Sequence, residues 1–154
     1  MTATVTTGAE VEAGYRWLEG ALQGDASLIA LVRPGGDDGT ATNADRVPDN
    51  VGLPAIMFAY QGGTGTRVVD RELYLSGVWQ VKVLTEEDGL DQAGPIAKRL
   101  HQVLEGRNAE VIPGDFGTLH QCTRESVLSL QETDETGRVF RHLGGLYRLL
   151  VGSN

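Results

Sequence analysis

The run RVFRHLGGLYRLLV, residues 138–151, most constrains how this chain can fold, because two adjacent glycines interrupt an otherwise strand-like segment. A glycine inside a strand usually marks a bulge, a bend or the close approach of another backbone. We therefore expect the run to be the closing strand of a sheet, with Gly144 and Gly145 at a bend or close contact. Arg141 and Arg148 flank the pair and are expected to face acidic partners in the same subunit or a neighbouring one.

The length and net charge of the chain limit the classes of protein to which it can belong. A chain of 154 residues predicts a single domain over 1–154, which needs no disulfide or metal to fold. The net charge of −8 disfavours a protein that grips nucleic acid through its phosphates, although an acidic wall can stand beside DNA and repel it. The N-terminus resembles no secretory signal and the chain has no membrane-length apolar run, which predicts folding in the cytoplasm.

Hydrophobic periodicity predicts an α+β fold. The predicted helices are one from Ala9 to Gly24, a short one over Leu28–Val32 capped by Ser27, and one that follows a polar turn at Thr85–Leu90 and ends near Glu105. The predicted strands are Pro54–Tyr60, Arg71–Leu84, Leu119–Glu132 and Arg138–Val151, with Ala109–Pro113 a short strand or an extended connection. The order α-α-β-β-α-β-β predicts a four-stranded, largely antiparallel sheet with the two long helices packed on one face.

Two glycine-rich segments are predicted to be loops. Residues 34–52 form a long loop whose four aspartates (Asp37, Asp38, Asp45 and Asp49) do not match the spacing of a calcium loop. We interpret it as a solvated loop or a contact between subunits. Residues 61–70, QGGTGTRVVD, lack the lysine and the following helix of a phosphate loop, and are predicted to be a hairpin connection. Residues 1–8 are predicted to be a flexible segment.

The candidate reactive residues do not form a recognisable catalytic or metal-binding pattern. His101, His120 and His142 lie on separate predicted elements, and His120 with Cys122 supplies at most two ligands where structural zinc needs four. A nucleophile made of Cys122 with His120 or His142 would need an oriented third group, which the sequence does not show. We therefore predict a protein that is not an enzyme and needs no cofactor or metal.

Four stretches of the chain, taken in order, resemble the tail terminator (tail-completion) proteins of long-tailed bacteriophages. The stretches are YRWLEGALQGDASLIALV, ELYLSGVWQVKVL, PIAKRLHQVLEG and FRHLGGLYRLLV. The resemblance spans about residues 13–151, and the R-H-x-G-G-x-Y-R run of the last strand is a recurring feature of that family. The loop at 34–52 departs from the family pattern by its length.

The resemblance implies a structural protein of the virion. It implies a homo-oligomeric ring, typically a hexamer, that caps the tail tube, stops its polymerisation and joins the tail to the neck proteins of the head, with DNA passing through the lumen. Such a protein would be assembled in the host cytoplasm and lie at the head-proximal end of the tail. The residues expected to serve folding or assembly are Gly144, Gly145, Arg141, Arg148 and Arg67.

Three other functions stay open from the sequence. One is another neck or minor tail subunit of the head–tail connector. A second is a small enzyme that uses Cys122, and a third is a ligand-binding α+β domain with a concave apolar pocket.

Overall fold

The computed structural model describes residues 9–67, 73–114 and 116–152. The helices are α1 (Ala9–Gln23), α2 (Ala26–Val32) and α3 (Ala93–Leu104). The strands are β1 (Thr42–Ala44), β2 (Ala55–Arg67), β3 (Leu73–Thr85), β4 (Glu110–Ile112), β5 (Gly117–Thr133) and β6 (Val139–Gly152). Within the described residues, no helix is long and apolar enough to cross a membrane.

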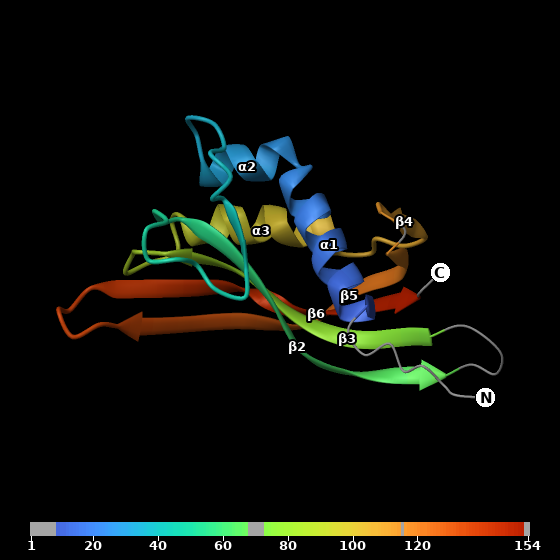
Figure 1. The fold of residues 1–154 in the computed structure, drawn as a ribbon. Coiled ribbons are helices and arrows are strands. Elements are labelled where there is room, and N and C mark those ends of the chain that lie inside the picture. The colour runs from blue at the N-terminus through green and yellow to red at the C-terminus, as the bar shows by residue number, and fades with distance from the viewer. Residues whose placement is uncertain (1–8, 68–72, 115, 153–154) are drawn as a thin grey trace.

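The six strands form one curled sheet in the order β1-β2-β3-β6-β5-β4 (Figure 1). Strand β1 runs parallel to β2, and every other neighbouring pair is antiparallel. The predicted four-stranded sheet with two long helices is therefore wrong, because the sheet is mixed, has six strands and carries three short helices. The extra strands are both three residues long, and a run that short carries no periodic signal in the sequence. Strand β4 lies within Ala109–Pro113, which the sequence predicted as a short strand or an extended connection.

Strand β2 extends further than its sequence predicts. The glycine-rich segment that was expected to be a hairpin connection continues the strand to Arg67, paired residue by residue with β3. A register shift between Tyr60 and Gly62 absorbs the irregularity, and Gly62 adopts a φ of +142°, which an L side chain rarely adopts. The chain reversal that follows Arg67 lies outside the described residues.

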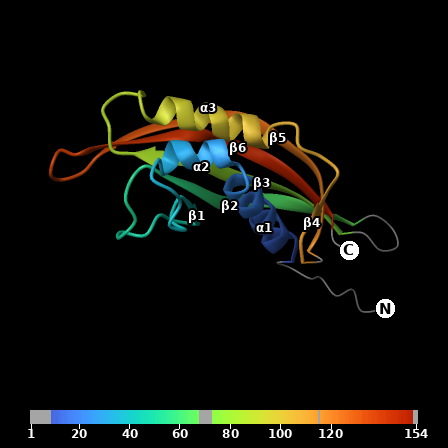
Figure 2. The same cartoon turned by 90° about the horizontal axis from the view of Figure 1, so that it is seen from above.

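The three helices lie on one face of the sheet (Figures 1 and 2). Between helices and sheet, Trp79 is fully buried. Its indole ring fills the space beside two glycines, since a Cβ at Gly14 of α1 would lie 2.3 Å from the ring and one at Gly77 would lie 2.5 Å from it. Because neither glycine carries a side chain, α1 can pack directly on the centre of β3.

The starts of the short helices are fixed by carboxylates. Asp25, rather than the predicted Ser27, caps α2 by accepting a hydrogen bond of 2.8 Å from the Leu28 amide. Glu87 accepts from the Gln92 and Ala93 amides at 2.9 and 2.7 Å, and so caps α3. The sequence left open whether Pro95 kinks the third helix or marks its true start. Helix α3 begins at Ala93, which places Pro95 in its first turn, where the missing amide is harmless.

The 34–52 segment is organised around Arg33. The guanidinium of Arg33 donates to the carbonyl oxygens of Pro54 and Gly52, the latter at 3.0 Å, and to the Thr40 hydroxyl at 3.1 and 3.2 Å. Further along the 34–52 segment, Asp45 accepts a hydrogen bond from the Tyr15 hydroxyl of α1. These bonds fold the segment back so that β1, which lies within it, can add to the edge of β2.

Candidate assembly surface

The glycine pair of β6 lies where three strands come closest together. A Cβ at Gly144 would lie 2.1 Å from the Val81 carbonyl oxygen and 2.6 Å from Lys82 Cα in β3. One at Gly145 would lie 2.9 Å from the Ser126 carbonyl oxygen in β5. The pair is therefore placed by backbone packing inside one chain, beside the β5 bulge between Arg124 and Ser126. Its role in assembly stays a prediction.

Arg148 has an acidic partner within the chain. Its guanidinium forms an ion pair with Glu125 and donates to the Ser76 hydroxyl at 2.8 Å, which joins β6 to both of its neighbours. The pKa of Arg148 is raised, mainly by its hydrogen bond to Glu125. This side chain is accordingly engaged in holding the sheet together.

Arg141 forms no ion pair among the described residues, although its charge contributes to lowering the pKa of Glu87. Its Nη2 donates to the Gln131 side chain at 2.7 Å and to the Asp88 carbonyl oxygen at 2.9 Å, while its buried Nε has no hydrogen-bond partner there. Arg67 ends β2 opposite Leu73, and its side chain lies outside what the structure describes. The structure therefore spreads the predicted assembly residues along the sheet and does not gather them into one site.

The face of the sheet turned away from the helices, here called the outer face, carries a titratable group of three side chains. His142 Nε2 lies 3.2 Å from a Glu132 oxygen, and Lys82 lies nearby with its side chain largely buried. Burial lowers the pKa of Lys82, and the charge of Glu132 opposes that shift. The pKa of His142 is also lowered, first by burial and then by Lys82, so the imidazole is neutral at neutral pH.

The outer face is close to electrically neutral, although the protein has a net charge of −8. Among the described residues, alternation along β3, β6 and β5 places Lys82, Arg148 and Glu132 on this face, and Glu125 joins them through its ion pair with Arg148. Acidic residues gather instead in the loop after β3 and in the β5–β6 turn, which the Arg138–Glu86 ion pair of 2.7 Å holds together. The molecule thus has a neutral sheet face and one acidic end.

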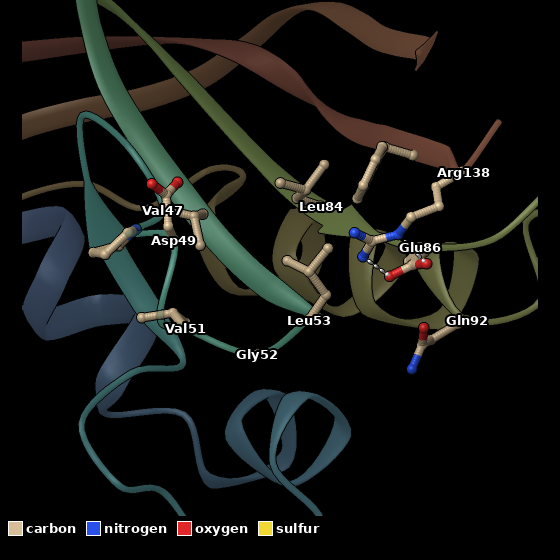
Figure 3. A pocket seen from close by; sticks show the side chains of 11 residues that line it. Val47, Asp49, Val51, Gly52, Leu53, Leu84, Glu86, Gln92 and Arg138 are labelled. Carbon is tan, nitrogen blue, oxygen red and sulfur yellow. Dashed lines mark hydrogen bonds and ion pairs between the residues drawn. The ribbon is translucent and has the colours of Figure 1, made fainter. Parts of the chain in front are cut away.

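A cavity of about 490 Å³ lies at the acidic end, between residues 47–53, the end of β3 and the start of β6 (Figure 3). Its walls are partly apolar, with Val47, Leu53 and Leu84 among them. The Arg138–Glu86 pair stands at one side, with the arginine 5.2 Å from the Phe140 ring. Among the described residues, no thiol, imidazole or hydroxyl group lines this cavity, and its ionisable groups are the side chains of Asp49, Glu86 and Arg138.

The candidate nucleophile is buried. Cys122 faces the core, and burial raises the pKa of its thiol to about 12, so the thiolate is not formed at neutral pH. His120, two residues away, stacks near Tyr74 with ring centroids 5.1 Å apart, and His142 contacts Glu132. Neither histidine is joined to Cys122 by a hydrogen bond in the described part of the chain, so the geometry does not support the cysteine–histidine alternative.

The loop aspartates are used locally. Asp37 and Asp38 accept hydrogen bonds from the amides two residues ahead, and Asp45 accepts from Tyr15. In the ranges that the structure describes, no group of three or more histidine, cysteine, aspartate or glutamate side chains is arranged to hold a metal ion.

A surface that sequence reasoning missed is the β5–β6 arm, defined as residues 125–143. Its tip projects beyond the helices (Figure 1). Val127 and Leu130 of β5 are 63% and 47% exposed on it. The signal that could have revealed the arm is the run SVLSLQ, residues 126–131, which is uncharged within an acidic chain and has three large apolar residues beside a polar turn.

A family model and a solved structure are similar to this chain. A family model described as "Tail completion protein gp17" matches residues 18–143. A solved chain from the virion of a native gene transfer agent particle is similar with a TM-score of 0.57 and 21% identity, covering 98% of this chain and 100% of that chain. At that identity the likeness shows a shared fold. No curated protein matches the chain by sequence.

Proposed function

Because this chain belongs to the tail completion protein gp17 family and is a structural component of a phage-like virion, we propose that it forms the ring that ends the tail tube. The proposed ring is a homo-hexamer at the head-proximal end of the tail. It stops polymerisation of the tube protein and gives the neck proteins a surface to join, and DNA passes through its opening.

The observation that carries this proposal is the family match over most of the chain, from the first helix to the last strand. The structure adds a surface suited to assembly. An arm with exposed Val127 and Leu130 leaves the body of the subunit on one side, and the cavity beside Asp49 and Arg138 opens at the acidic end. A ring needs two different complementary patches on each subunit. Because Arg138 belongs to both the arm and the cavity wall, these two features lie at one end of the subunit and would supply one of the two patches.

The charge of the chain agrees with a passage for DNA. A protein with a net charge of −8 does not neutralise phosphates and would let a duplex slide past without holding it. The proposed function involves no cofactor and no reaction, and the buried thiol of Cys122 supports that view.

The proposal is tested by adding the purified protein to growing tubes of its own tail protein. We expect tubes that stop lengthening, with a ring of density at one end in negative-stain micrographs. A protein that leaves tube length unchanged while it binds the portal-side neck proteins would instead be a neck subunit. A strictly monomeric protein that binds neither would contradict a role at the tail end.

A further inference from the structure

The sheet has two open edges, one on each side. Strand β1 covers β2 only as far as Phe58, and the Tyr60 amide donates to the Tyr15 hydroxyl at 2.7 Å. From Gln61 to Arg67, no strand among the described residues lies beside this edge of β2. On the β5 side, the backbone of Cys122 is hydrogen-bonded to the backbone of Gly106 and Arg107. The Arg124 amide donates to the Glu105 carboxylate at 2.7 Å. From Glu125 to Thr133 the edge of β5 has no strand beside it among the described residues.

Each open edge begins at a β-bulge and has charged residues only near its ends (Arg67 on β2, Glu125 and Glu132 on β5), so its central part has little protection against pairing with another strand. Natural edge strands are protected by lysine, by proline or by covering segments, because their unpaired amides and carbonyls attract another strand. Residues 61–66 (QGGTGT) and 126–131 (SVLSLQ) contain neither a charge nor a proline. These two runs are uncharged although the protein has 34 charged residues, 21 acidic and 13 basic.

We propose that the open edge of β5 in one copy pairs with the open edge of β2 in the next copy, so that the sheet continues from subunit to subunit. This pairing rests on the proposed function, since it would be the contact that joins neighbouring subunits in the proposed ring. The partner is an extended backbone, since only another strand supplies the alternating donors and acceptors that an open edge needs. The two edges differ, so the contact is head-to-tail, as ring closure requires.

Strand direction and side-chain alternation limit how the edges can meet. Three antiparallel steps separate β2 from β5, so the two strands run in opposite directions. Rotation about a ring axis leaves the up or down sense of each strand along that axis unchanged. Strand β5 of one copy therefore runs antiparallel to β2 of the next copy. Outer-face residues must face outer-face residues. Thr64 pairs with Ser76 on the outer face, so its partner would be Ser126 or Leu128 and would not be Val127.

The open edges lie at opposite ends of the sheet, with that of β2 near its far end and that of β5 along the arm (Figure 1). If these two edges pair, each copy is displaced along the strand direction relative to the preceding copy in the ring. A sheet closes on itself only when its strands are inclined to the axis and its register is staggered, so this displacement is a condition for closure.

The test uses paired cysteines. Thr64→Cys is combined in turn with Ser126→Cys and with Leu128→Cys, because a disulfide requires the two Cα atoms to lie within about 4.4–6.8 Å. After mild oxidation, we expect a ladder of covalent multimers from at least one double variant on a non-reducing gel. Each single variant should run on the same gel as a monomer without cross-links. The natural Cys122 should not interfere because it is buried.

The outcomes separate this contact from the ring itself. Intact rings in solution with no cross-link from either double variant would overturn the edge pairing and leave the ring in place. A covalent dimer from a single Ser126→Cys or Leu128→Cys variant would show β5 paired with itself, which also overturns it. A strict monomer at high concentration would contradict the ring, and the pairing with it.

A second comparison does not depend on disulfide geometry. Leu130→Lys places a charge on the open edge, whereas Leu31→Lys places one on α2 at a position of similar exposure, 42% against 47%. We expect the first variant to weaken association at least tenfold and the second to leave it unchanged, with equal melting temperatures for the two monomers. Equal association of both variants would count against the proposal.

Discussion

At the scale of single residues, Gly144 is the position where added atoms should be least tolerated. A Cβ there would lie 2.1 Å from a backbone carbonyl oxygen of β3, which cannot move without separating the strands. We expect Gly144→Ala to destabilise the fold by about 1–3 kcal/mol, as overpacking usually does. Urea unfolding measures the change. Gly65→Ala is the matched control, because nothing lies within 4 Å of its added Cβ, and unchanged stability of both variants would refute the argument.

Asp25 should contribute stability that depends on pH. It caps α2 and forms two hydrogen bonds to Arg99, at 2.6 and 3.0 Å, and the Arg99 contact is the main cause that lowers the pKa of its carboxyl below 3.8. Since the folded-state pKa is depressed, the stabilisation is complete above the unfolded-state value and is lost as the pH falls through the lowered one.

The Asp25 prediction can be separated into its two parts. Asp25→Asn keeps a capping oxygen and loses the ion pair, which should cost about 0.5–1 kcal/mol at neutral pH, because the pair is partly exposed to solvent. Asp25→Ala should cost about 1 kcal/mol more through loss of the cap. Denaturant titrations at several pH values should show the natural protein and Asp25→Asn converging in acid. A constant difference at every pH would argue against the ion pair.

At the scale of elements, the 34–52 segment should depend on Arg33. The Arg33 side chain is 15% exposed and bonds to two carbonyl oxygens and to Thr40. We expect Arg33→Ala to cost about 1–3 kcal/mol, because it leaves the carbonyl oxygen of the buried Pro54 without its hydrogen bond. Amide exchange should also quicken across 34–53. Arg46→Ala, at an exposed site in the same segment, should have little effect, and equal effects of the two would refute this role.

The sequence predicts the long elements well, for physical reasons. The boundaries of α1 and β6 follow from periodicity and from Gly24, and lie within a residue or two of those observed. The fold class was wrong because β1 and β4 are created by tertiary contacts: Arg33 folds back the loop that contains β1, and β4 pairs with only three residues of β5. In β2, glycines that normally indicate a turn lie inside a strand, because β3 continues beside them and pairs with them.

The candidate site was predicted less completely than the fold. Gly144 and Gly145 were singled out correctly as positions of close contact, because glycine inside an apolar strand has few other causes. Arg148 proved to bind Glu125 of its own chain, and a sequence cannot distinguish that partner from one in a neighbour. The open edges could not be predicted, since they are defined by where β1 and β4 stop.

At the scale of the whole molecule, the structure divides into a helix-covered body, a neutral outer sheet face and an acidic end from which an arm projects (Figures 1 and 2). Membership of the tail completion family agrees with surfaces that serve contacts within a virion. The apolar residues on the arm and the uncharged edges would be a liability in a protein that acts alone, and are useful in one that assembles.

The most direct test of the proposed function is a cryo-electron microscopy reconstruction of the intact particle at the junction of tail and head. We predict a single closed ring of this fold between the last ring of the tail tube and the neck, with DNA or an open channel on its axis. Finding the chain at the distal tip of the tail, or as an isolated copy without contacts to other copies, would contradict the account.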